Sequence, residues 1–184
     1  MFVDTEHTAD TKFFRLLGID ENKILLCQPN NVNVALGVIK KLVGKKLVDC
    51  VIVDTMTAII SQYELEQPLL SNFLQAGHYV AELKFMREFL RCIRAAGCIG
   101  ILVDQIRAIF HPYLKDTIVG YDTISDTIKF FSSIRILLTR GRFIRDKENK
   151  VVKGFVVKLK VIKNKFAAPF RQCRLIYYLD KGFC

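Results

Sequence analysis

The sequence is poor in several features that mark particular protein classes. It has no tryptophan, four prolines and three histidines among 184 residues. No apolar run approaches the roughly 18 residues that a membrane helix requires, and the opening MFVDTEHTAD is mixed and acidic, unlike a secretory signal. We therefore expect a soluble cytoplasmic protein without a membrane partner.

Two kinds of site motif are also missing. None of the six cysteines forms a Cys-x-x-Cys pair, so that we expect no zinc site, and in a reducing compartment no structural disulfide. The phosphate-loop pattern G-x-x-x-x-G-K-[ST] does not occur, because Gly44-Lys45 lacks the required preceding glycine.

Positive charge is concentrated in the last third of the chain. The net charge is +10; residues 127–184 contain 15 Lys/Arg and 3 Asp/Glu, a net of +12, whereas residues 1–126 contain 13 and 15, a net of −2. A basic region of this kind indicates a polyanionic partner such as nucleic acid. Lysines that alternate with apolar residues are equally typical of a solvated strand face, and charge alone does not decide between the two.

Hydrophobic periodicity predicts strands and helices that alternate, followed by several strands in succession. This order favours an α/β fold: a parallel sheet flanked by helices, with an antiparallel extension, in a single domain over residues 1–184. Residues 106–123 show no clean period, and we expect a long mobile loop of functional importance there. The expected strands are 2–4, 23–27, 48–53, 98–103, 133–139, 151–163 and 173–179; the expected helices follow Asp10 to residue 17 and Asn31 to residue 43, and cover 76–95 and about 124–131.

Polar residues follow three of the expected parallel strands. They are Asp4-Thr5-Glu6, Asp54-Thr55 and Asp104-Gln105. Ligands of open α/β sheets bind at the carboxyl ends of the strands, and an acid there suits a phosphate-bound Mg²⁺. Aspartates that merely cap the next helix would give the same pattern.

Five motifs in order carry a resemblance to a known family. FVDTEHTAD, VIVDTMTA, ILVDQIR, IKFFSSIRI and VIKNKFAAPF occur with the spacing of bacterial RecA, from Phe2 to about Leu179. The chain thus resembles the RecA-like P-loop NTPase core. The resemblance implies homologous recombination and DNA repair in the SOS response to DNA damage, by a single-stranded DNA-dependent ATPase that binds ATP and Mg²⁺. It also implies self-association as a filament, or association with full-length RecA.

The resemblance assigns roles around ATP. Glu6 matches the general base, Asp54 the acid that holds Mg²⁺, and Gln105 the glutamine that senses the γ-phosphate. Asp10 and Phe13 match two residues that contact the adenine. Lys163 and Lys165 match two lysines that reach a neighbour's ATP as catalytic cations. Without the resemblance, Glu6 reads as a helix cap, Phe13 as a core residue and the lysines as solvated strand residues.

The resemblance also assigns DNA and subunit contacts. Residues 67–76 and 107–123 match two DNA-binding loops, while Lys129 and Phe130 match a subunit interface. The DNA-binding residues implied are Phe73, Leu74, Arg87, Arg107 and Phe110.

Departures from the family pattern define an alternative. Without a phosphate loop, we expect no ATP hydrolysis by this chain alone, and Asp104 and Asp126 place acids where phosphates should approach. The chain is then either a fragment of a recombinase core, without the family's N-terminal filament helix and C-terminal domain, or a truncated non-catalytic relative that binds DNA or modulates a RecA filament.

The resemblance has one consequence for the sheet. In the family fold, the phosphate-loop strand lies between the strands that match 98–103 and 133–139. We expect 98–103 to be an unpaired apolar edge and the chain to associate, unless 133–139 pairs with it directly.

Overall fold

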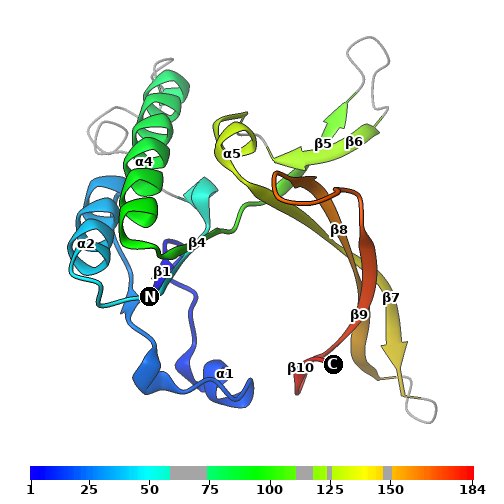
Figure 1. The fold of residues 1–184 in the computed structure, drawn as a ribbon. Helices are drawn as coiled ribbons and strands as arrows, with labels where there is room; N and C mark the ends of the chain where they lie inside the picture. Colours follow the sequence, from blue (N-terminus) through cyan, green and yellow to red (C-terminus); the bar gives the residue numbers. More distant parts are fainter. Residues whose placement is uncertain (59–73, 111–117, 124–125, 147–150) are drawn as a thin grey trace. The chain divides into compact units, whose positions relative to one another are not determined.

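The computed structural model describes residues 1–58, 74–110, 118–123, 126–146 and 151–184 (Figure 1). The chain forms two compact units, each made of two segments. Unit 1 combines Met1–Ala9 with Asn22–Phe130, and unit 2 combines Asp10–Glu21 with Phe131–Cys184. The expectation of a single domain stays a prediction. Among the described residues, no helix is long and apolar enough to cross a membrane.

Unit 1 is built on a four-stranded parallel sheet. Its strands have the order β2-β1-β3-β4, and every neighbouring pair is parallel. Their short apolar runs suit a sheet that is buried by helices. The strands are β1 (Phe2–Asp4), β2 (Leu26–Cys27), β3 (Cys50–Asp54) and β4 (Ile99–Leu102).

Two helices pack against each other and cover one face of this sheet (Figure 1). Helix α2 (Val32–Gly44) begins after Asn31. The side-chain oxygen of Asn31 caps the helix by accepting hydrogen bonds from the amides of Asn33 and Val34. Helix α4 (Leu74–Ala96) ends at Gly97, which has a φ of 68° and closes the helix as expected. Their inward-facing side chains are buried with the sheet residues Val3, Val51 and Val53: Ala35, Ile39 and Val43 from α2, and Phe85, Met86, Phe89 and Ile93 from α4.

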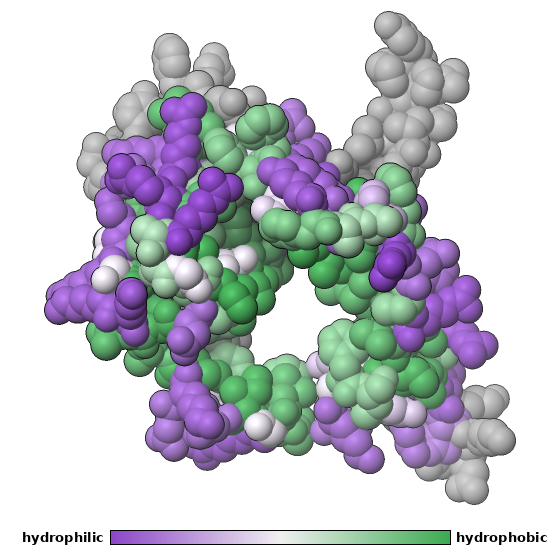
Figure 2. Space-filling model, in the orientation of Figure 1, coloured by the Kyte–Doolittle hydropathy of each residue, from purple (hydrophilic) through white to green (hydrophobic). Residues whose placement is uncertain are grey.

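Strand β4 has one covered and one exposed face. A Cβ atom at Gly100 would lie 2.8 Å from the ring of Phe89, so that glycine allows α4 to approach the strand closely. The alternate residues Ile99, Ile101 and Val103 are 62%, 45% and 38% exposed. Figure 2 shows apolar surface of this kind in green among the polar residues. Among the strands that the structure describes, β4 is the outermost of its sheet, as expected for the apolar segment 98–103.

The expectation of a loop over 106–123 is wrong for the residues that the structure describes. Strand β5 (Ile106–Phe110) pairs antiparallel with β6 (Ile118–Thr123). Isoleucine, valine and aromatic residues favour strands, but a register shift at Ile109/Phe110 interrupts the regular alternation. The 3-10 helix η2 (Met56–Ala58) follows β3, and helix α5 (Asp126–Phe131) follows β6 in the sequence.

Unit 2 contains a four-stranded antiparallel sheet and a short helix. The strand order is β10-β9-β8-β7. Helix α1 (Thr11–Leu16) is followed by the 3-10 helix η1 (Glu21–Lys23). The strands are β7 (Ile134–Arg145), β8 (Val152–Asn164), β9 (Gln172–Tyr178) and β10 (Gly182–Phe183).

One face of this second sheet carries an aromatic cluster. The ring of Tyr177 lies 5.1 Å from Phe155 and 5.1 Å from Phe183, and the Arg140 guanidinium lies 5.3 Å from the centre of the Phe143 ring. The ring contacts of Tyr177 help hold β8 and β10 to β9, whereas the Arg140–Phe143 contact lies within β7. The α/β fold class, with a helix-flanked parallel sheet and an antiparallel extension, is confirmed.

Candidate functional site

The carboxyl ends of β1 and β3 are tied together by their first loop residues. The Thr5 amide donates to the Asp54 carbonyl at 2.8 Å, and the Thr5 hydroxyl donates to the Thr55 carbonyl at 2.7 Å. Since neighbouring parallel strands end at the same side of a sheet, these bonds place Glu6 beside Thr55.

Glu6 is the centre of a polar network between three strand ends. Its Oε1 accepts a hydrogen bond from the Thr55 hydroxyl at 3.1 Å and another from the Gln105 side-chain amide at 3.3 Å. Glu6 and Gln105 are exposed, whereas Thr55 is buried. The structure thus brings two predicted site residues, Glu6 and Gln105, into direct contact.

Asp4 differs from the other acids at this edge because its carboxylate is engaged within the fold. It is 1% exposed and accepts hydrogen bonds from the amides of Thr8 (3.2 Å) and Ala9 (2.8 Å) and from the Gln28 side chain (2.9 Å). Burial alone would raise the pKa of Asp4, but these hydrogen bonds outweigh it and lower the pKa. Asp4 therefore shapes the loop that presents Glu6.

The pKa of Asp54 is shifted in the opposite direction from that of Asp4. Burial, then the negative charges of Glu6 and Asp4, raise the pKa of its carboxyl group. A cation at this position would relieve the repulsion. In the described part of the chain no three metal-ligating side chains gather. Mg²⁺ commonly takes one or two carboxylates plus substrate phosphates. The carboxylate of Asp54 is an oxygen donor of the required kind.

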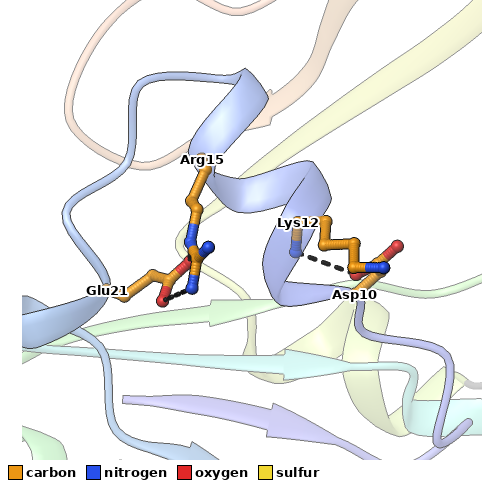
Figure 3. Close-up of polar contacts among 4 residues, drawn as sticks. All are labelled: Asp10, Lys12, Arg15 and Glu21. Atoms are coloured by element: carbon orange, nitrogen blue, oxygen red, sulfur yellow. Dashed lines mark hydrogen bonds and ion pairs between the residues drawn. The ribbon is translucent and has the colours of Figure 1, made fainter.

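The predicted adenine contacts lie in unit 2. Asp10 caps α1, since its Oδ1 accepts the Lys12 amide at 2.8 Å (Figure 3). One turn later the Arg15 guanidinium pairs with the Glu21 carboxylate, which fixes the segment after the helix. Phe13 is 38% exposed, so that its ring is accessible for stacking.

The two predicted catalytic lysines, also in unit 2, flank Asn164: Lys163 lies at the end of β8 and Lys165 directly follows the strand. Burial, Lys165 and Arg135 together lower the pKa of Lys163. The Lys165 amide donates to the Ser133 carbonyl at 3.0 Å, and the Asn164 side chain accepts the next two amides. Two exposed rings lie in the same turn: Phe166 (78%) and Phe170 (67%).

The residues assigned to DNA and subunit contacts are distributed over several elements. Arg87 is exposed on α4, and Arg107 and Phe110 lie in β5, where their backbones pair with β6. Leu74 is the first residue of α4, and Phe73 lies outside the described residues. On α5, Lys129 pairs with Asp126 at 3.0 Å and Phe130 is 75% exposed.

The basic part of the sequence forms a cross-strand group in unit 2. Lys158 of β8 lies opposite Thr139 of β7 and Arg174 of β9, and Lys160 lies opposite Leu137 and Gln172. Partners that are directly opposite project from the same face. This face therefore carries Lys158, Lys160 and Arg174 together, and all three are exposed.

The sequence placed Thr5 and Thr55 at strand ends but gave neither of them a role in the site. The available signal was weak: each is a small polar residue next to a strand-ending acid. Their importance depends on backbone distances between β1 and β3, which no local pattern contains.

Comparison with known proteins identifies the family. Residues 1–184 match the profile of the family described as RecA N-terminal domain. The chain belongs to the RecA family. RecA proteins similar to it include those of Mycoplasma mycoides subsp. mycoides SC (31% identical over 98% of this chain and 51% of the relative), Desulfovibrio desulfuricans (34%, 92% and 46%) and Haemophilus ducreyi (30%, 98% and 47%). The chain spans about half the length of these curated RecA relatives.

Proposed function

We propose that this chain supplies the ATPase core of a RecA-type recombinase that acts in homologous recombination and DNA repair in the cytoplasm. Its partners are ATP with Mg²⁺, single-stranded DNA, and further copies of itself or full-length RecA in a filament. The proposal places the protein in the SOS response to DNA damage.

The observation that carries the proposal is the convergence of Glu6, Asp54 and Gln105 at one edge of the parallel sheet. Asp54 would hold Mg²⁺, which when bound neutralises charge on the phosphates. Glu6 would orient the attacking water and accept its proton. Gln105, one residue before β5, would pass the state of the phosphates to the β5–β6 sheet; its contact with Glu6 supports that role.

The residues of unit 2 extend the same proposal. Asp10 and Phe13 would contact the adenine of the bound ATP. Lys163 and Lys165 would reach the ATP of a neighbouring copy and stabilise transition-state charge there, as a cation supplied in trans does in related enzymes. The lowered pKa of Lys163 follows from burial and two cationic neighbours, and an anion would reverse that effect.

DNA contact is proposed for both units. In unit 1, the single-stranded DNA would contact Phe73, Leu74, Arg87, Arg107 and Phe110. Lys158, Lys160 and Arg174 would add electrostatic attraction to phosphates from unit 2. Lys129 and Phe130 would contact the next subunit; support comes from the 75% exposure of Phe130.

Titration calorimetry with ATP tests the nucleotide part. We expect Mg²⁺-dependent binding to the wild type that is lost in Asp54→Asn and retained in Glu6→Gln, because Glu6 acts on water rather than on the metal. Binding that is equal in all three proteins, with or without Mg²⁺, would refute the assignment of Asp54.

A second candidate is a non-catalytic RecA relative that binds DNA or modulates a RecA filament. Two observations favour it: the phosphate-loop pattern does not occur in these 184 residues, and Asp104 and Asp126 add negative charge near the proposed contacts. The test is to add the chain to filaments of a full-length RecA and record their ATPase rate. A rate that changes with added chain, together with no ATPase activity of the chain alone, supports this candidate over the first.

A further inference from the structure

A cross-strand pair of like charges lies at one end of the β7–β8 hairpin. Arg135 of β7 is directly opposite Lys163 of β8, and residues that are directly opposite project from the same face of a sheet. Like charges in such a pair repel each other and weaken the pairing of the strands. Both side chains are half-buried, so that solvent screens their repulsion less than it would at an exposed position.

The turn after β8 holds a third cation beside this pair. The Lys165 amide donates a hydrogen bond to the Ser133 carbonyl at 3.0 Å, which keeps Lys165 next to the start of β7. The side chain of Asn164 accepts the amides of Phe166 (2.9 Å) and Ala167 (3.2 Å) and fixes the turn. The three cations belong to one hairpin and the turn that follows it, so that they converge whatever other segments surround them.

This arrangement disfavours the charge on Lys163. Burial is the largest cause of the lowered pKa of its ammonium group, and the positive charges of Lys165 and Arg135 add to that effect. A bound anion would favour the charged form of all three side chains. Cations that are held together against their mutual repulsion therefore indicate an anionic ligand.

We propose that Arg135 is a third phosphate-binding residue, and that Arg135, Lys163 and Lys165 together bind the terminal phosphate of a nucleoside triphosphate. The inference rests on the proposed function, which assigns the two lysines to the ATP of a neighbouring copy and gives Arg135 no role. The planar guanidinium group can bind two phosphate oxygens at once, whereas each ammonium group acts as a point charge.

The charge of the ligand favours a nucleotide over the backbone of a nucleic acid. A phosphodiester carries one negative charge, whereas a terminal phosphate group carries about −1.5 to −2 at neutral pH. Three cations at one place match the larger and more concentrated charge.

Binding of tripolyphosphate to the full chain tests the proposal, because this probe has terminal phosphates but no base or sugar. In titration calorimetry, Arg135→Gln should weaken binding about fivefold. Arg135→Lys should weaken it less, since lysine keeps the charge but cannot bind two oxygens at once. Arg174→Gln is the matched control: it removes the same charge from an exposed position of β9 and should have the smaller effect. Equal losses in Arg135→Gln and Arg174→Gln would overturn the proposal.

A measurement at Lys163 separates the site from general attraction to a basic protein. NMR of the Lys163 side chain over a pH series should show that tripolyphosphate raises its lowered pKa, and that Arg135→Gln makes this rise smaller. Circular dichroism shows whether each variant is folded; if Arg135→Gln is not, Arg135→Lys carries the comparison. A rise in the pKa of Lys163 that is the same with and without Arg135 would reject the role of Arg135.

Lys163→Gln distinguishes failure of this inference from failure of the proposed function. Weaker tripolyphosphate binding in Lys163→Gln but not in Arg135→Gln would overturn the role of Arg135 alone. Unchanged binding in both would also remove the lysine from the proposed phosphate contact. A single-stranded oligonucleotide gives the last comparison: if Arg135→Gln weakens only its binding, and not that of tripolyphosphate, the ligand is a nucleic-acid backbone and the proposal is wrong.

Discussion

The side-chain amide of Gln105 donates a hydrogen bond to the carboxylate of Glu6 at 3.3 Å, although 99 positions separate the two residues. The bond links the end of β1 to the residue that precedes β5. The Thr55 hydroxyl donates to the same oxygen from the end of β3. One carboxylate oxygen thus connects three strand ends.

Removal of the Thr55 hydroxyl should loosen this connection. Thr55→Val keeps the shape of the buried side chain but leaves Glu6 Oε1 with one donor fewer, so that we expect a loss of about 1 kcal/mol in the free energy of unfolding. Thr55→Ser retains the donor and is the control, with a smaller loss. Urea denaturation followed by circular dichroism measures both; equal losses would show that the methyl group, rather than the hydrogen bond, matters.

Asp54→Asn should stabilise the protein at neutral pH. The folded-state pKa of Asp54 is raised above its ordinary value of 3.8, so its favourable contribution is complete below pH 3.8 and is lost as the pH rises through the folded value. The variant avoids that loss. Its melting temperature should exceed that of the wild type at pH 7, and the difference should vanish below pH 3.8. A wild type that is more stable at pH 7 would contradict the assignment of the repulsion.

Asp4→Asn should have the opposite effect. The lowered pKa of Asp4 means that its contribution is present above the ordinary value of 3.8 and is lost as the pH falls through the lower folded value. An asparagine sets its own donors against the donors of Thr8, Ala9 and Gln28, and should cost about 2 kcal/mol at pH 7. Thermal unfolding from pH 7 to pH 2 should show this deficit shrink below pH 3.8; a deficit independent of pH would argue against the carboxylate charge.

Single-stranded DNA binding should be weak, indifferent to sequence and sensitive to salt. Neutralisation of roughly four phosphates predicts a slope near −3 in a plot of log affinity against log salt concentration. The double variant Lys158→Gln, Lys160→Gln removes two exposed cations and should reduce the magnitude of the slope by about 1.4. Fluorescence anisotropy over a salt series measures it; binding that does not respond to salt would reject the electrostatic account.

ATP hydrolysis by the chain alone should not exceed background. The 184 residues contain no phosphate-loop pattern to hold the β- and γ-phosphates near Glu6 and Asp54. Phosphate release with saturating single-stranded DNA and Mg²⁺ is the measurement. Activity that disappears in Glu6→Gln would disprove the prediction, because contaminating ATPases are unaffected by that substitution.

Elements with a clear period were predictable from sequence. Residues 76–95 repeat apolar positions at helical spacing and lie within α4, and the alternating residues 151–163 form most of β8. The β5–β6 sheet was not predicted from the sequence because the register shift at Ile109/Phe110 disturbs the alternation of its residues. Strand β10 has two residues, too few for any period, and depends on Gly182, where a Cβ would lie 2.6 Å from Leu17.

The candidate site was predictable from the sequence only in part, because some of its contacts join distant segments. Strand ends that terminate in acids are a local signal, and they located Glu6 and Asp54. Which acid is engaged by the fold and which is exposed depends on contacts between distant segments, such as Gln28 with Asp4. The family resemblance supplied the roles of Lys163 and Lys165, which periodicity alone assigns to an ordinary strand.

Asp10–Glu21 belong to unit 2, whereas the residues on both sides of this segment belong to unit 1. The chain passes between the units three times, so that no single cut separates them. A gene segment that encodes only residues 131–184 would produce the antiparallel sheet without α1 and its Leu17 contact with β10. Any attempt to isolate that unit, or to exchange it with a relative, must therefore carry the twelve-residue insertion along with the C-terminal strands.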